Sequence, residues 1–335
     1  MSNSDEAPTR LLMAMTPDRA LDVCDDQTRH RLESRFEVVW ASDTLDAQEL
    51  GRLLPGTQIV ITSWGTPRLP ADLLSEGGGP HVVAHAAGSV KRLLPRERVG
   101  NGLEVFSAAG RIAWSVGEYC LAACLTMLRS LPAYDASVRT QGWRPAGVRG
   151  QELRGRRVAL IGASSTARAF RALLQPFGAD VVVYDPYLRP DSAKALGVRA
   201  VSLEEAMASS IVSVHVPDVP ATTGMISSAM LARMPDGGLL INSSRAAAID
   251  MAGLEPHILS GRLQAALDVY ETEPPELSAS LRAASGVLLT PHIAGDSVQG
   301  HQALVGYVLD DVVDFLESGH RGPSWVDPAA WDTAA

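Results

Sequence analysis

Short apolar runs alternate with amphipathic stretches along almost the whole chain. In the first third, the apolar runs occupy residues 11–15, 36–40, 58–62, 81–86 and 103–107. Helical patterns lie between several of them, at residues 19–35, 46–54 and 71–76. Strands that alternate with helices form βαβ units, in which helices cover both faces of a parallel sheet. The sequence therefore predicts an α/β fold.

A second series of the same kind follows a polar stretch rich in Gly and Arg at residues 142–157. A long helical pattern at residues 116–139 precedes that stretch. The apolar runs of the second series occupy residues 158–161, 181–184, 211–216, 239–242, 265–269 and 287–289. Helical patterns lie among them, at residues 168–177, 227–233 and 251–260. Six strands of this kind suit a complete dinucleotide-binding sheet.

The length of 335 residues predicts about two domains. We expect both to be doubly wound parallel sheets: a flavodoxin-like domain of residues 1–108 and a Rossmann domain of residues 109–297. The last helical pattern, residues 298–318, carries an apolar stripe and precedes Gly319, a residue type that often ends helices. Because it follows the completed second sheet, we expect residues 298–335 to return to the first domain. The tail from residue 321 is expected to be loosely ordered.

Composition excludes several classes of function. The net charge of −9 argues against a nucleic-acid partner, and no apolar stretch is long enough to cross a membrane. Three cysteines without a Cys-x-x-Cys spacing predict neither a disulfide framework nor a metal site. Asp5 and Glu6 precede the first apolar run, which is unlike a secretory signal. We therefore expect a cytoplasmic protein without a metal.

The first strand of the second series leads into a glycine-containing turn. Residues 157–161 are followed by Gly-Ala-Ser-Ser-Thr-Ala and then by a helical pattern. This is the strand–turn–helix context of the GxGxxG fingerprint, with Gly162 in the first position, Ser164 in place of the second glycine and Ala167 in the third. The predicted pyrophosphate contacts are Gly162, Ser164, Ser165 and Thr166.

Asp185 stands 23 residues after Gly162, at the end of the next strand. An acidic residue at about this offset accepts hydrogen bonds from the adenosine ribose. The turn and Asp185 together predict that the chain binds NAD. The alternative is an ordinary strand–helix turn capped by Ser164 or Ser165, with Asp185 opening a loop.

Three later strands are each followed by residues that suit carbonyl chemistry. Arg245 follows one strand, Asp268 and Glu273 follow the next, and His292 follows the last. Ligands of open α/β sheets bind beyond the carboxyl ends of the strands, so these residues are expected to converge. A His can donate a proton near neutral pH, and a neighbouring carboxylate favours its charged form and fixes its tautomer. An Arg can bind a substrate carboxylate and polarise a ketone.

The order of these motifs resembles the D-isomer-specific 2-hydroxyacid dehydrogenase family. The motifs are VYDPY (183–187), VSVHVP (212–217), LINSSR (240–245), ALDVYETEP (266–274) and LTPHIAG (289–295). The resemblance implies that Arg245 is the substrate-binding catalytic residue, that Glu273 is the partner of His292, and that His292 is the acid/base. It also implies cofactor contacts at His215, Val216, Pro217, Ser243, Ser244, Asp268, His292, Ala294 and Gly295, with Asp268 near the nicotinamide carboxamide.

The chain departs from the family pattern in the first domain. Where the family has a substrate loop like GVGxD, residues 86–90 read Ala-Ala-Gly-Ser-Val, and we expect the backbone N–H groups of Gly88 and Ser89 to bind a substrate carboxylate. Trp64 either lines the substrate site or packs in the core. The basic residues Lys91, Arg92, Arg96 and Arg98 either attract a second negative charge on the substrate or are a solvated surface.

These observations predict an NAD-dependent oxidoreductase that interconverts a small 2-oxo acid and a D-2-hydroxy acid in a cleft between two domains. The helical pattern at residues 116–139 resembles the family's dimer-interface helix, which implies a homodimer. The alternative function is an NAD(H)-sensing interaction protein, similar to the corepressors that resemble this family.

Overall fold

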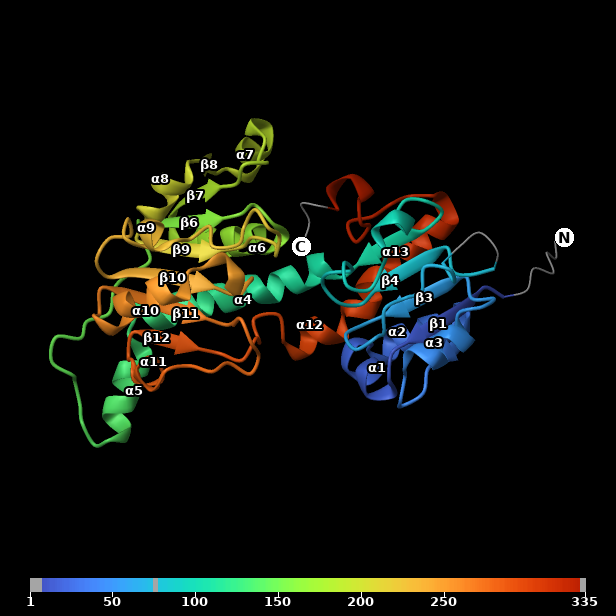
Figure 1. The fold of residues 1–335 in the computed structure, drawn as a ribbon, viewed down its shortest axis with the longest axis horizontal. Helices are drawn as coiled ribbons and strands as arrows, with labels where there is room; N and C mark the ends of the chain where they lie inside the picture. Colours follow the sequence, from blue (N-terminus) through green and yellow to red (C-terminus); the bar gives the residue numbers. More distant parts are fainter. Residues whose placement is uncertain (1–7, 75–77, 332–335) are drawn as a thin grey trace. The chain divides into compact units, whose positions relative to one another are not determined.

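The computed structural model describes residues 8–74 and 78–331. These described residues form two compact units: residues up to Ile112 with those from Asp296 onward, and Ala113–Gly295 (Figure 1). Each unit is a parallel sheet with helices on both of its faces. The predicted α/β fold with two parallel-sheet domains is therefore confirmed.

The described part of the first unit contains a sheet of five strands in the order β2-β1-β3-β4-β5. This is the flavodoxin-like order, in which the chain reverses its direction of growth between β1 and β3. All neighbouring strands run parallel. Their bounds are β1 Arg10–Ala14, β2 Glu37–Trp40, β3 Ile59–Thr62, β4 Val82–His85 and β5 Glu104–Ser107.

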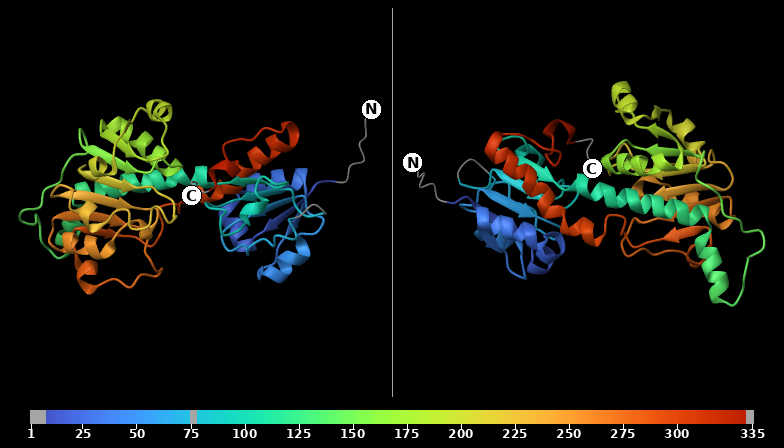
Figure 2. Two further views of the ribbon diagram at one scale, coloured as in Figure 1. Left: turned by 45° about the horizontal axis from the view of Figure 1, so that its top comes forward. Right: turned by 180° about the vertical axis from the view of Figure 1, so that it is seen from behind.

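Successive residues of β1 point to opposite faces of this sheet, as strand geometry requires. Leu11 and Met13 pack in a cluster with α13 (Leu304–Ser318), whereas Leu12 and Ala14 pack in a cluster with α3 (Ala47–Leu53). Figure 2 shows α13, in red, running across the strands of this unit. The apolar stripe expected on the last helix therefore lies in the core of the first unit.

Two helix predictions in the first unit were wrong. The single helix expected at residues 19–35 is two helices, α1 Pro17–Val23 and α2 Asp26–Arg35. The chain breaks there because the Asp25 side chain accepts a hydrogen bond from Thr28 N at 2.7 Å and caps a new helix. Of the helix expected at residues 71–76, residues 71–74 form turns, and residues 75 and 76 lie outside the described residues.

The described part of the second unit contains a sheet of seven strands in the order β12-β11-β10-β9-β6-β7-β8. This is the dinucleotide-binding order with one strand added at the end. Their bounds are β6 Arg157–Ile161, β7 Asp180–Tyr184, β8 Arg199–Ala200, β9 Ile211–Val214, β10 Gly238–Asn242, β11 Leu263–Leu267 and β12 Val287–Leu289. The two residues of β8 are exposed, so no apolar run marked this strand in the sequence.

Both long helical patterns are interrupted. The one at residues 116–139 becomes α4 Ala109–Leu128 and α5 Leu131–Arg139, which meet at Ser130 with a φ of 51°. The one at residues 298–318 becomes α12 Val298–Gln302 and α13. Gly319 has a φ of 74° and ends α13, so the predicted C-cap is confirmed. Shorter helices are α6 Ser165–Leu174, α7 Pro190–Leu196, α8 Leu203–Met207, α9 Ser228–Leu231, α10 Met251–Leu259 and α11 Ala279–Ala283.

The expectation of a loosely ordered tail was wrong for residues 321–331. Val326 N–H donates to Val105 O at 2.8 Å, and Ser107 N–H donates to Ser324 O at 2.7 Å. The tail thereby satisfies backbone groups of β5, the edge strand of the first sheet, which would otherwise be open to another chain. Residues 332–335 lie outside the described residues.

Among the helices of residues 8–74 and 78–331, none is both long and apolar enough to span a bilayer. Within the same ranges, no group of three or more His, Cys, Asp or Glu side chains could hold a metal ion.

Candidate active site

The candidate site residues of the second unit follow the carboxyl ends of its parallel strands. Gly162 follows β6, His215 follows β9, Arg245 follows β10, Glu273 follows β11 and His292 follows β12. Parallel strands bring all their carboxyl ends to one edge of the sheet. The sheet therefore places the nucleotide-type turn and the three candidate catalytic residues on the same edge.

The turn after β6 requires glycine at its first position. Gly162 has a φ of 98°, a conformation that other residues rarely adopt. A Cβ at this position would lie 2.7 Å from the carbonyl oxygen of His215, which is too close. Gly162 N–H also donates to Tyr184 O at 2.7 Å, which ties the turn to β7.

Ser164 replaces the second glycine of the fingerprint without straining the backbone. Its φ of −62° and ψ of 173° lie in the extended region, and its Oγ accepts a hydrogen bond from Ala167 N. Ser164 therefore caps α6, whose first backbone N–H groups point out of the helix end. A glycine-initiated turn that ends at a helix N-terminus suits a pyrophosphate, so the residues present fit a dinucleotide.

Asp185, which follows β7, is hydrogen-bonded to the backbone of this turn. Its Oδ2 accepts from Ala163 N at 2.8 Å, and its Oδ1 accepts from Tyr187 N at 2.8 Å. Carboxylate oxygens have further lone pairs, so both remain able to accept from a ribose hydroxyl. The contact with Ala163 was not predicted from the sequence, because the offset of Asp185 indicates only a ligand contact.

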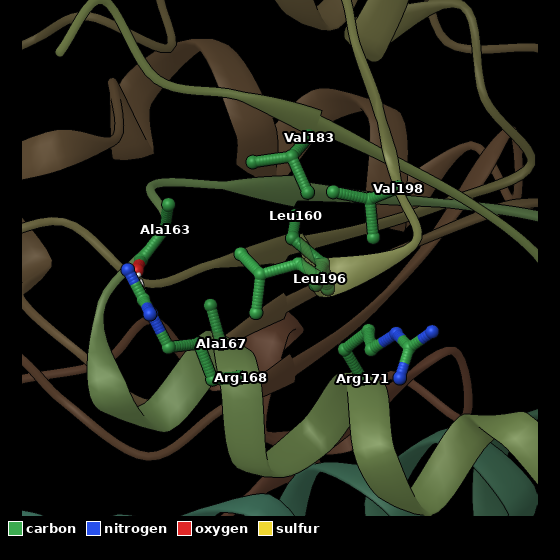
Figure 3. Close-up of a pocket in the computed structure, with 8 residues that line it drawn as sticks. All are labelled: Leu160, Ala163, Ala167, Arg168, Arg171, Val183, Leu196 and Val198. Atoms are coloured by element: carbon green, nitrogen blue, oxygen red, sulfur yellow. Dashed lines mark hydrogen bonds between the residues drawn. The ribbon is translucent and has the colours of Figure 1, made fainter. Parts of the chain in front are cut away.

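Behind the turn lies a small apolar cavity of about 10 Å³, room for roughly one water molecule. Arg168 Nε donates to Ala163 O at 3.0 Å beside it (Figure 3). The cavity is lined by Leu160, Ala163, Ala167, Arg168, Arg171, Val183, Leu196 and Val198. It is far too small for a nucleotide, so it is not the proposed cofactor site.

His215 is buried under the turn and is neutral near pH 7. Its Nδ1 lies 3.0 Å from Thr166 Oγ1, and its Nε2 lies 2.9 Å from Ser213 Oγ. Burial lowers the pKa of His215 to about 3. Both ring nitrogens are engaged with hydroxyls, so His215 supports the turn rather than exchanging protons. Val216 and Pro217 continue the same segment.

The loop after β10 is held by Asn242, a residue that sequence reasoning missed. Asn242 is buried, donates from Nδ2 to Arg245 O at 2.9 Å, and accepts from Ser244 N at Oδ1. Its signal in the sequence was a polar residue at the end of an apolar run. Ser243 Oγ lies 3.2 Å from Cys120 Sγ. These contacts fix the backbone that carries Arg245.

Glu273 and His292 form a hydrogen-bonded pair. His292 Nδ1 lies 2.8 Å from Glu273 Oε2 and 3.0 Å from Oε1. Partial burial of Glu273 opposes ionisation, but hydrogen bonds from His292 and Tyr270 N, with the charge of Arg245, hold the pKa of Glu273 below its usual value. Glu273 is thus ionised at neutral pH and accepts the Nδ1 proton, which leaves Nε2 of His292 as the nitrogen free to act.

The backbone of His292 has a left-handed φ of 55°, which costs a non-glycine residue about 1–2 kcal/mol. Asp268, with no exposed surface, accepts from Ile293 N at 2.9 Å and from Ala294 N at 2.8 Å. The resemblance implied that Asp268 lies near a nicotinamide carboxamide. The structure shows its carboxylate beneath the His292 turn, where these backbone donors bind it. Gly295 follows this turn.

In the first unit, Trp64 follows β3 and is 39% exposed, so it is not a core residue. Its ring centroid lies 5.0 Å from that of His301. Gly88 and Ser89 follow β4 in a bend, with Gly88 O accepting from Ser107 Oγ. The loop that carries both residues is thus tied to β5.

The basic run of the first unit is partly structural. Arg96 donates to Pro328 O at 2.8 Å and lies over the Trp331 ring at 5.7 Å. Arg98 donates to Leu74 O. Both guanidinium groups thus donate to backbone carbonyls, a structural role that neither of the two interpretations of this run included.

The fold and this site define an α/β protein with an NAD-binding domain. The model of the NAD binding domain of D-isomer specific 2-hydroxyacid dehydrogenases matches residues 121–294, and the chain belongs to that family.

Individual relatives carry related names. The chain is 31% identical over 269 residues to a D-3-phosphoglycerate dehydrogenase of Mycobacterium bovis, a match that covers 80% of this chain and 51% of that protein. It is 28% identical over 243 residues to a hydroxypyruvate reductase of Thermotoga maritima, covering 72% and 78% of the two chains. The chain thus spans about half the length of the curated D-3-phosphoglycerate dehydrogenase it matches.

Solved structures support the fold. A phosphoglycerate oxidoreductase from Rhizobium etli superposes with a TM-score of 0.81 at 23% sequence identity, covering 96% of this chain and 99% of that chain. At this identity the likeness concerns the fold alone.

Proposed function

We propose that the chain is an NAD-dependent oxidoreductase that interconverts a small 2-oxo acid and a D-2-hydroxy acid. The observation that carries this proposal is the 2.8 Å contact between His292 Nδ1 and Glu273 Oε2, on the same sheet edge as the nucleotide-type turn. An acid/base beside a dinucleotide site is what reversible carbonyl reduction needs.

Each of the three catalytic side chains has its own role in this reaction. When bound, the reduced nicotinamide supplies a hydride to the substrate carbonyl carbon. His292 donates a proton from Nε2 to the carbonyl oxygen, where negative charge develops. Glu273 stabilises the charged ring and fixes its tautomer. Arg245, whose Nη1 donates to Ser244 O at 2.7 Å, binds the substrate carboxylate through its other guanidinium N–H groups and polarises the ketone.

The cofactor would be held mainly by the turn after β6. Gly162 and Ser164 shape the turn. Ser165 and Thr166 lie at the N-terminus of α6, which would bind the pyrophosphate, and Asp185 would accept a hydrogen bond from the ribose. The remaining proposed cofactor contacts are His215, Val216, Pro217, Ser243, Ser244, Asp268, His292, Ala294 and Gly295. Asp268 is buried, and we propose that it also supports the site through the backbone of Ile293 and Ala294.

Residues of the first sheet and the names of relatives bear on the substrate. Trp64, Gly88 and Ser89 are proposed substrate contacts because they follow β3 and β4 at the carboxyl edge of the first sheet. Relatives named D-3-phosphoglycerate dehydrogenase and hydroxypyruvate reductase suggest hydroxylated or phosphorylated 2-oxo acids.

The test is NADH oxidation with a panel of 2-oxo acids that includes glyoxylate, hydroxypyruvate and phosphate- or phosphonate-bearing oxo acids. We expect turnover with at least one, and its loss in His292→Asn with NADH binding retained. NADH binding without turnover of any acid would contradict the proposal and favour the alternative, an NAD(H)-sensing interaction protein.

We also propose a homodimer that uses α5 and the segment after it. Leu131, Val138 and Trp143 are 52%, 55% and 73% exposed, and large exposed apolar side chains in one segment are a feature of interfaces. Figure 1 shows α5 and the following segment extending from the body of the second unit. Light scattering should give twice the chain mass for the wild type and a monomer for Trp143→Glu. A monomeric wild type would refute the dimer.

A further inference from the structure

Every backbone N–H group in the His292 turn has an acceptor within the turn or directly beneath it. His292 N–H donates to Thr290 O at 3.1 Å, and the next two N–H groups, of Ile293 and Ala294, donate to Asp268. Pro291 has no N–H group. The turn is thus held by its own backbone on one side and by one buried carboxylate on the other.

Two hydroxyl groups extend this arrangement to α4. Thr290 Oγ1 donates to Asp268 Oδ1 at 2.6 Å, which uses its single proton. The Tyr119 hydroxyl, 2.6 Å from Thr290 Oγ1, must therefore donate to it. Burial raises the pKa of Tyr119, so the phenol keeps its proton. Hydrogen bonds in such a series polarise and strengthen one another.

The carbonyl group of Thr290 is fixed from the opposite side. The Tyr270 hydroxyl lies 3.0 Å from both Thr290 O and Leu267 O, at the end of β11. Thr290 is thus held through its hydroxyl by Tyr119 and Asp268 and through its carbonyl by Tyr270. A residue held at both ends can impose an unusual backbone conformation two positions later.

That conformation is the left-handed φ of 55° at His292, which the surrounding contacts must maintain. A His292 that relaxes to an ordinary φ would turn its ring away from Glu273, because the ring direction follows the backbone. Resting on the proposed function of His292, we propose that Tyr119 and Thr290 are positioning residues. Together with Asp268, their hydroxyl groups hold the turn so that His292 faces Glu273.

The experiment uses single-atom changes of the hydroxyl groups in the full chain. Thr290→Val replaces the hydroxyl with a methyl group, Thr290→Ser keeps the hydroxyl, and Tyr119→Phe removes the outer donor. Thr57→Val is the matched control, because Thr57 Oγ1 donates to Leu53 O at 3.0 Å in the first unit. The readouts are kcat, KM for NADH, and hydrogen exchange of the Ile293 and Ala294 amides.

We expect Thr290→Val to lower kcat about ten-fold or more and Tyr119→Phe to lower it several-fold, with a smaller change in KM for NADH because the turn after β6 holds most of the cofactor. Exchange at Ile293 and Ala294 should accelerate in both variants. Thr290→Ser and Thr57→Val should keep the wild-type kcat and the wild-type protection of these two amides against exchange.

The proposal would be overturned if Thr290→Val and Tyr119→Phe kept the wild-type kcat and the wild-type protection of these amides against hydrogen exchange. So would a loss in Thr290→Ser equal to that in Thr290→Val, since the hydroxyl would then not matter. If the wild type turns over no 2-oxo acid, the proposed function fails. Hydrogen exchange then still decides whether the hydroxyl groups hold the turn.

Discussion

The ring of His292 shares its Nδ1 proton with both oxygens of Glu273, at 2.8 and 3.0 Å. Both side chains are substantially exposed, 52% for His292 and 40% for Glu273. Solvent therefore screens their attraction, and the pair is worth less to folding than a buried one. The pair matters more for the orientation of the His292 ring than for folding, because the Glu273 carboxylate binds Nδ1 and leaves Nε2 free for substrate.

Glu273→Gln should move the pH dependence of both reaction directions to lower pH. Reduction needs the protonated ring, so its rate falls as pH rises, whereas oxidation needs the neutral ring and rises with pH. Glu273 is ionised throughout this range because its pKa is lowered, and its charge favours the protonated ring.

Profiles of kcat/KM against pH for wild type and Glu273→Gln, in both directions, measure this displacement. His292→Asn is the control and should lose both profiles. Unmoved midpoints would show that Glu273 does not tune His292, and the exposed Glu271 would become the next candidate.

Arg245→Ala should impair substrate use far more than cofactor binding. Loss of a charge-assisted contact that strengthens in the transition state costs on the order of 3 kcal/mol, or roughly 100-fold in kcat/KM. Arg245 lies on the loop held by Asn242, apart from the turn after β6, so the Kd for NADH should change little. Fluorescence titration measures that Kd. Equal losses in kcat/KM and NADH affinity would mean that Arg245 is structural.

Asp185 should make the protein prefer NADH to NADPH. Its carboxylate can accept from a ribose 2′-hydroxyl and would repel a 2′-phosphate. We expect kcat/KM with NADH to exceed kcat/KM with NADPH by about ten-fold or more, and we expect this ratio to be smaller in Asp185→Asn. Arg189 stands close in sequence and could instead bind that phosphate, so Arg189→Ala is the comparison. Equal or better use of NADPH by the wild type would refute the assignment.

The sequence predicted the sheets well because their signals are local. Apolar runs such as residues 58–62 and 158–161 match β3 and β6 closely. The helix breaks were missed because they depend on single caps, such as Asp25, or on a left-handed residue, such as Ser130. The two exposed residues of β8 carry no apolar signal at all.

For the candidate site, sequence reasoning identified residues by type and position but not their contacts. The motif at residues 289–295 marked His292, yet nothing in the sequence linked it to Tyr119, which is 171 positions from Thr290. The contacts of Asp268 with the backbone of Ile293 and Ala294 likewise depend on the pairing of β11 with β12. Such contacts are long-range and leave no local pattern.

Two buried histidines should make the fold lose stability below neutral pH. Burial lowers the pKa of His215 to about 3 and that of His85 to about 4, whereas an unfolded histidine titrates near 6.5. Above roughly pH 6.5 both histidines are neutral in the folded and in the unfolded chain, so they give the stability no dependence on pH. Below it the unfolded chain binds protons that the folded chain does not, so stability falls by up to about 1.4 kcal/mol per pH unit for each histidine.

Urea unfolding between about pH 5 and 7.5 measures this slope, above the range in which carboxylates titrate. His85→Asn should reduce the slope, whatever its effect on stability at neutral pH, because its buried ring at the end of β4 is replaced by a group that does not titrate. His30→Asn, on the exposed surface of α2, is the control and should keep the wild-type slope. A slope unchanged in His85→Asn would show that the ring is protonated, and so accessible to water, in the folded protein.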